Sequence, residues 1–361
     1  MCASPVSEKR KYSEDLVSLE KPLKRSRGLT MDLDVIHKHL NYAHCEGCKR
    51  ELSANLFPYE LSQVSGGAEN SAFIFDAKYL DDVFIAKINN LSDSRYRKII
   101  LNEIDLYEYL GANEFTAEYV AHYPVTVSQY ALILKKYPLT LSDLINAHEN
   151  GFNFRRLKII TKRLISILEF LKSKKNIHAD FKGNNFFIDD AGKIVLGDFG
   201  VSSKEERFGV FPCVQSIFIK APEVVLKYDR PGYQIDMWSL GCLLYKLSTG
   251  KTLFDVKEFL YIDLISNMRK CLGKIPTELI ARSENYESFF IKNADGYKQI
   301  YYSEEVIDVD YIKDNIIAAA RARGDSLEDV DKLVDLIKTC LRYNPHERLT
   351  IEQAKLHPFV I

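Results

Sequence analysis

Acidic, basic and amide side chains occur in two short runs near the middle of the chain. The runs are His178-Ala179-Asp180-Phe181-Lys182-Gly183-Asn184-Asn185 and Asp198-Phe199-Gly200. Transfer of a phosphoryl group needs positioning and charge neutralisation far more than covalent help from the protein. In such a reaction Asp180 would accept the proton of the attacking hydroxyl, and Lys182 would stabilise the transferring group. Asn185 and Asp198 would hold the metal ions that bridge the phosphates, so the residues predict phosphoryl-transfer chemistry.

The order of these residues, Asp-x-Lys-x-x-Asn followed by Asp-Phe-Gly, resembles the catalytic loop and metal loop of eukaryotic protein kinases. The strand-like stretch Lys193-Ile194-Val195-Leu196-Gly197 separates the two runs. The resemblance implies ATP and Mg²⁺ as cofactors. It also implies an α+β fold with two lobes, in which a small antiparallel sheet with one helix precedes a larger, mostly helical lobe.

Two elements upstream must position the nucleotide if the resemblance holds. Val83-Phe84-Ile85-Ala86-Lys87 alternates apolar residues into a lysine, which predicts a half-buried strand. In the family this lysine, here Lys87, contacts the α and β phosphates. Residues 96–110 have apolar side chains at helical spacing, and within them Glu103 is the best candidate for the carboxylate that pairs with Lys87. Glu108 is the alternative.

A further strand is expected over Tyr130-Ala131-Leu132-Ile133-Leu134, with the hinge between the lobes directly after it. The resemblance places Leu134 at the back of the adenine pocket. It also implies that backbone groups around Lys136 hydrogen-bond the adenine edge. The sequence offers no physical reason for the adjacent Lys135 and Lys136.

The loop that covers the phosphates departs from the family pattern. The expected Gly-x-Gly-x-x-Gly-x-Val falls on Gly66-Gly67-Ala68-Glu69-Asn70-Ser71-Ala72-Phe73. Only Gly66 matches a patterned glycine, while Gly67, Ala68 and Ser71 are small enough for the backbone to approach phosphates. Each added Cβ disfavours the positive φ that such loops often use. The cofactor-binding prediction therefore includes these residues, with weakened ATP affinity.

The activation segment departs from the pattern at several positions. Ala179 stands where many kinases carry the arginine that receives an activation-loop phosphate. Residues 213–220 resemble the Tyr-x-Gln-Ser-Arg-Tyr-Tyr-Arg stretch of the homeodomain-interacting and dual-specificity tyrosine-regulated kinases, with Cys213 at the tyrosine and Ile217 at the first arginine. We therefore expect activity that does not depend on phosphorylation at Ser202 or Ser203.

Structural residues of the family complete the match. Asp236 is expected to brace the catalytic loop, and Arg348 is expected to pair with Glu223 of the Ala-Pro-Glu triplet. The pattern spans residues 59–361, with an N-lobe over 59–136 and a C-lobe over 137–361. Residues 1–58 lie outside this pattern and are expected to form a separate, largely disordered arm.

Composition limits the other function classes. The net charge of −1 gives no whole-protein attraction to nucleic acid, and no apolar run reaches the roughly 20 residues of a membrane helix. The 7 cysteines are scattered, which favours reduced thiols over a disulfide framework.

The N-terminal arm carries two separate signals. Lys9-Arg10-Lys11 and Lys24-Arg25-Ser26-Arg27 are basic clusters of the kind that a nuclear import receptor binds, although a solvated tail is the alternative. The residues His37, His39, His44, Cys45 and Cys48 could bind zinc, and free cysteines in a linker are the alternative interpretation.

The predicted function is ATP-dependent phosphorylation of serine or threonine hydroxyls on protein substrates, with dual specificity for tyrosine as an open variant. Nuclear localisation is expected, with a cytoplasmic pool as an alternative. A pseudokinase or scaffold that keeps the fold without catalysis is the competing hypothesis. It draws on the altered glycine loop, Ala179 and Cys213.

Overall fold

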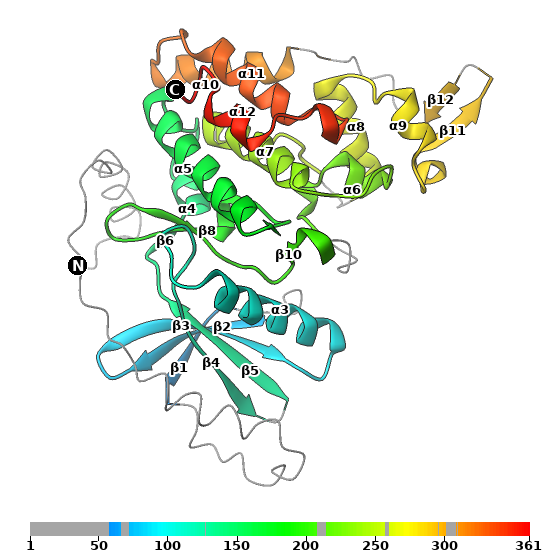
Figure 1. Cartoon of the computed structure of the whole chain (residues 1–361). Coiled ribbons are helices and arrows are strands. Elements are labelled where there is room, and N and C mark those ends of the chain that lie inside the picture. The colour runs from blue at the N-terminus through cyan, green and yellow to red at the C-terminus, as the bar shows by residue number, and fades with distance from the viewer. Residues whose placement is uncertain are drawn as a thin grey trace. The chain divides into compact units, whose positions relative to one another are not determined.

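The computed structural model describes residues 58–65, 72–126, 128–207, 214–256, 260–294, 296–300, 308 and 310–361. These residues divide into two compact units. One contains residues 109–117 and 137–361, and the other contains the described residues up to Glu108 together with residues 118–136. Figure 1 shows a sheet with one helix in the N-terminal part and mainly helices in the C-terminal part. The α+β prediction is confirmed.

The N-terminal unit is built on an antiparallel sheet of order β1-β2-β3-β5-β4. Its elements are β1 (Glu60–Ser65), β2 (Ala72–Tyr79), β3 (Asp82–Asn90), α3 (Ser94–Leu110), β4 (Tyr119–Thr126) and β5 (Gln129–Lys135). The last two residues of α3 belong to the other unit. The expected strands around Lys87 and Leu134 and the expected helix are thus β3, β5 and α3.

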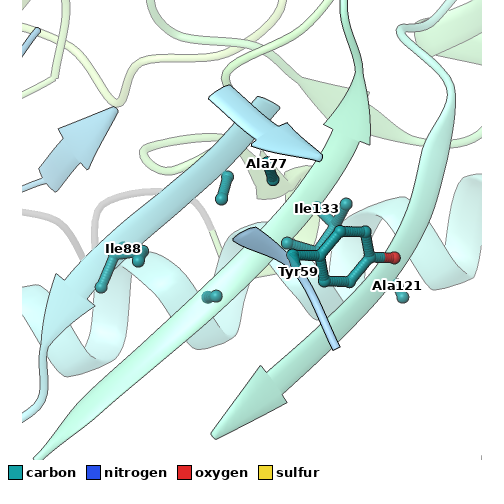
Figure 2. Packing of buried hydrophobic residues seen from close by; sticks show 7 residues of the cluster. Tyr59, Ala77, Ile88, Ala121 and Ile133 are labelled. Carbon is teal, nitrogen blue, oxygen red and sulfur yellow. The ribbon is translucent and has the colours of Figure 1, made fainter. Parts of the chain in front are cut away.

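Side-chain alternation gives this sheet two faces of different character. Ala86 and Ile88 of β3 pair with Ile133 and Ala131 of β5, and all four are buried. Tyr59 joins this cluster as its aromatic member, as Figure 2 shows. Since neighbouring residues in a strand point to opposite faces, Lys87 lies on the other face of the sheet.

The C-terminal unit is mainly helical, with short strands and single 3₁₀ turns at its loops. Its first elements are β6 (Leu139–Thr140), α4 (Leu141–Asn146), α5 (Phe154–Ser173), β7 (Asn176–Ile177), η4 (Gly183–Asn185), β8 (Phe186–Ile188), β9 (Ile194–Leu196), β10 (Ser203–Lys204), η5 (Glu205–Arg207), η6 (Ile217–Ile219) and α6 (Pro222–Leu226). The remainder are α7 (Gln234–Thr249), α8 (Tyr261–Leu272), α9 (Thr277–Ala281), η7 (Tyr286–Ser288), β11 (Phe290–Asn293), β12 (Gly296–Gln299), α10 (Tyr311–Arg323), α11 (Val330–Cys340), η8 (Pro345–Glu347) and α12 (Ile351–Lys355).

Helix α7 is the centre of this unit. Most of its residues are buried, and it packs against α5, α10 and α11. It ends at Gly250, whose φ of 74° is left-handed and whose added Cβ would lie 2.3 Å from the carbonyl oxygen of Glu149. Helix α5 begins where the Asn153 side chain accepts a hydrogen bond from the backbone N–H of Arg156. These packed helices support the loops between β7 and α6.

Among the described residues, no helix combines the length and the apolar character needed to cross a bilayer.

Candidate active site

Lys87 and Glu103 form an ion pair within the N-terminal unit. Lys87 Nζ donates to Glu103 Oε2 at 2.8 Å, and the Glu103 side chain is fully buried. Low exposure reduces screening by water, so the pair fixes the position of the lysine. Glu108, the alternative partner, is half exposed and lies 3.4 Å from the Tyr119 hydroxyl. The structure therefore brings Glu103, and not Glu108, to Lys87.

Residues at the end of β5 share the Lys87 face of the sheet. Lys87 is opposite Leu132, and Leu134 follows two positions later, so Leu134 points to the same face. Lys136 Nζ lies 2.7 Å from Asp76 Oδ2 of β2. This contact gives a physical reason for one of the two adjacent lysines, because it ties the residue that follows β5 to β2, which lies beyond β3 in the sheet.

Asp236 braces the catalytic loop from the N-terminus of α7. Its carboxylate accepts hydrogen bonds from the backbone N–H groups of His178 at 2.7 Å and Ala179 at 2.9 Å. Ala179 has a φ of 63°, a left-handed conformation that costs free energy for any residue with a Cβ. Burial raises the pKa of Asp236 to about 7, and the two donated amide hydrogens oppose that shift. The loop keeps its strained turn because Asp236 holds both amides.

His178 is held as a neutral ring inside this loop. Its Nδ1 lies 3.2 Å from the backbone N–H of Asp180, and its Nε2 lies 3.1 Å from the carbonyl oxygen of Gly197. An amide can only donate and a carbonyl can only accept, so the proton is on Nε2. Complete burial lowers the pKa of His178, which agrees with the neutral form. The histidine thus links the catalytic loop to the strand before Asp198.

Asp180 lies at the centre of a small polar network. Its Oδ1 accepts hydrogen bonds from the Ser216 backbone N–H at 3.0 Å and from Ser216 Oγ at 2.8 Å. Its Oδ2 is 2.7 Å from Lys182 Nζ, which also donates to Ser216 Oγ at 2.7 Å. A hydroxyl therefore lies between a carboxylate and an ammonium, which is the environment that a phosphoryl acceptor requires.

Asn185 and Asp198 supply oxygen atoms of the kind that Mg²⁺ prefers. Asn185 Nδ2 donates to the Asp180 carbonyl oxygen at 2.8 Å and to Asp180 Oδ2 at 3.2 Å. Because these bonds use the amide nitrogen, the Asn185 oxygen is the atom that could bind a cation. Asp198 has a left-handed φ of 60°. The donor chemistry of both residues fits magnesium.

Two residues of the activation segment contribute more than the sequence interpretation assigned to them. Ser216 contacts both Asp180 and Lys182, as described above. Gln215 is buried, and its amide nitrogen donates to the carbonyl oxygens of Ile219 and Ile235 and to Ser239 Oγ at 2.9–3.1 Å. Its Oε1 accepts from the Ala221 backbone N–H at 3.0 Å. The sequence did contain a sign of these roles, because Gln215 and Ser216 match the Gln-Ser pair of the kinase stretch that residues 213–220 resemble.

Several predicted residues lie outside the described part of the chain. They are the glycine-loop residues Gly66, Gly67, Ala68 and Ser71, then Cys213, the two basic clusters, and the candidate zinc ligands at positions 37–48.

The chain belongs to the protein kinase domain family, whose model matches residues 69–360. Its relatives carry kinase names. It is 30% identical over 279 residues to a probable serine/threonine-protein kinase dyrk2 of Dictyostelium discoideum, an alignment covering 75% of this chain and 29% of the relative. It is 25% identical over 303 residues to the serine/threonine-protein kinase prp4 of Schizosaccharomyces pombe, covering 78% and 62%.

A dual specificity tyrosine-phosphorylation-regulated kinase 2 of Drosophila melanogaster is 26% identical over 319 residues, covering 84% of this chain and 41% of the relative. These findings confirm the resemblance to the dual-specificity tyrosine-regulated group. The chain spans less than two thirds of the length of each of these relatives.

Proposed function

We propose that this chain transfers the γ-phosphoryl group of ATP, with Mg²⁺, to serine or threonine hydroxyls of protein substrates. The observation that carries the proposal is the network at Asp180. There the Asp180 carboxylate and the Lys182 ammonium both hydrogen-bond the hydroxyl of Ser216, at 2.8 and 2.7 Å. Serine and threonine are favoured because Lys182 stands in the catalytic loop. The kinase names of the relatives support the same class.

Each residue has a separate task in this reaction. Asp180 would orient the acceptor hydroxyl and take its proton, and Lys182 would neutralise charge on the transferring group. Lys87, fixed by Glu103, would bind the α and β phosphates, and Leu134 would contact the adenine. Bound magnesium, held by Asn185 and Asp198, supplies charge neutralisation at the phosphates. The scaffold hypothesis gains no support, because each of these side chains is present and the described ones lie in ordered contacts.

Replacing Lys87 with methionine tests the proposed role of this lysine in binding the phosphates of ATP. We expect kcat/KM for phosphate transfer from ATP and Mg²⁺ to a generic basic protein to fall by about two orders of magnitude or more, since a preorganised charge on the phosphates is lost. The readout is incorporation of labelled phosphate. Lys78→Met is the matched control, because Lys78 is an exposed lysine of the same sheet. Equal turnover in the wild type and Lys87→Met would contradict the proposal.

The site of action that we propose is the nucleus, with import through Lys9-Arg10-Lys11 and Lys24-Arg25-Ser26-Arg27. Clusters of this charge fit the acidic grooves of an import receptor. A fusion of residues 1–30 to a fluorescent reporter should accumulate in nuclei, and alanine substitution of both clusters should abolish the accumulation. Uniform distribution of the unmodified fusion would refute the nuclear assignment.

A further inference from the structure

Side-chain and backbone hydrogen bonds tie the first part of the activation segment to the catalytic loop and to the strand before it. Ser202 Oγ donates to the carbonyl oxygen of His178 at 2.9 Å, and the Ser202 side chain is fully buried. Strand β10 then pairs antiparallel with β7, with Ser203 opposite Ile177. The Glu205 backbone N–H donates to the Lys175 carbonyl oxygen at 2.9 Å.

The Lys204 side chain extends from this short ladder to an aromatic ring. Its Nζ lies 4.2 Å from the centroid of the Tyr109 ring, within the range of a cation–π interaction. The Tyr109 hydroxyl donates to the carbonyl oxygen of Lys174 at 3.3 Å, in the turn that precedes β7. Tyr109 and these partners belong to the same compact unit. One tyrosine thus contacts both the activation segment and the turn beside it.

A third contact holds the turn that follows β10. Arg230 donates from its guanidinium to the Glu206 carbonyl oxygen at 3.2 Å. The position where many kinases place a phosphate-binding arginine is Ala179, which is fully buried and carries no charge. The segment from Ser203 to Glu206 is therefore held by contacts that are available as soon as the chain folds.

From these contacts we propose that Tyr109 and Lys204 form an anchor that orders the start of the activation segment without phosphorylation. Tyr109 is a positioning residue, because it acts through Lys204 and the β7–β10 ladder. The anchor is a property of the unphosphorylated fold, and only its consequence for turnover rests on the proposed kinase function. Residues 203–206 should stay ordered in protein that carries no phosphate.

Hydrogen exchange of phosphatase-treated protein tests the anchor directly. Exchange of the backbone amides in 203–206 should be slow in the wild type and about two- to fivefold faster in Tyr109→Leu, as expected for loss of an exposed cation–π contact. Tyr109→Phe keeps the ring and should remain close to the wild type. Lys204→Met should match Tyr109→Leu, and the double variant should add little to either, because both remove one interaction.

The control is Lys292→Met, which removes a cation–π contact with Tyr297 in the β11–β12 hairpin and should leave 203–206 unchanged. Full exposure of these amides in the phosphate-free wild type would overturn the proposal, and so would additive effects of the two single variants. In a kinase assay, Tyr109→Leu should lower kcat by a similar factor, with rescue by phenylalanine. Slow exchange without any phosphate transfer would keep the anchor and refute the proposed function alone.

Discussion

Replacing Asp180 with asparagine is expected to lower phosphate transfer by about 10²- to 10⁴-fold, the usual contribution of a general base. The substitution preserves shape, and the asparagine oxygen can still accept hydrogen bonds from the Ser216 backbone N–H and Oγ. It removes the negative charge that lies 2.7 Å from Lys182 Nζ. Single-turnover transfer from ATP and Mg²⁺ to a generic basic protein is the measurement.

Two comparisons make the Asp180 result interpretable. Asp190→Asn changes an exposed carboxylate of the same unit and should keep full activity. Nucleotide affinity of Asp180→Asn, measured by calorimetry, should stay within a few-fold of the wild type because Asp180 acts on the acceptor hydroxyl. Transfer within threefold of the wild type would rule out Asp180 as the base. Lys87→Met prepared and measured in the same way excludes a contaminating enzyme, because it should abolish only the transfer that this chain catalyses.

Replacing Arg348 with methionine is expected to lower the free energy of unfolding by about 3–5 kcal/mol. Arg348 binds Glu223 with both terminal nitrogens, at 2.7 and 2.9 Å, and both side chains are almost completely buried. The guanidinium also lies 5.2 Å from the Trp238 ring centroid. Methionine fills similar volume but leaves the Glu223 carboxylate buried without its counter-charge. Urea unfolding followed by circular dichroism measures the loss.

A surface pair and a double variant serve as controls for this effect. Arg282→Met breaks an exposed contact with Asp229 at 3.6 Å and should cost less than about 1 kcal/mol. Combining Arg348→Met with Glu223→Leu should recover part of the stability, because the orphaned charge is then absent. A loss below about 1 kcal/mol for Arg348→Met alone would show that the buried pair is not a major source of stability.

The sequence predicted elements best where a local pattern specifies them. Alternation around Lys87 predicted a strand, and the observed β3 covers Asp82–Asn90. Helical spacing predicted a helix over residues 96–110, where α3 lies, and the kinase resemblance named Glu103 as the best candidate partner of Lys87, which it contacts. The roles of the site residues in catalysis stay predictions, because geometry alone does not show turnover.

Contacts between distant residues were beyond the reach of these patterns. Ser216 reaches Asp180 across 36 positions, and Lys136 reaches Asp76 across 60. Neither separation leaves a periodic trace in the sequence. Left-handed backbone at Ala179 and Gln215 was equally hidden, since local rules assign positive φ to glycine. At both positions hydrogen bonds from remote residues hold a conformation that the local sequence disfavours.

The β11–β12 hairpin was also missed, although the sequence carries the dipeptide Asp295-Gly296, a type that is typical of hairpins. The kinase resemblance directed attention to catalytic residues, and the hairpin lies in a stretch for which that pattern made no statement. The preference of Asp-Gly for tight turns, considered apart from the kinase pattern, would have predicted this hairpin.

The burial of Ser202 limits the states of the protein in which this residue can be phosphorylated. Its hydroxyl is enclosed and bonded to the His178 carbonyl oxygen, so a modifying enzyme has no access to it once the C-terminal unit has folded. A phosphate can therefore be added to Ser202 only while the segment around it is open. Because the enclosed site has no room for a solvated negative charge, a phosphate at Ser202 is expected to keep this segment open rather than to order it.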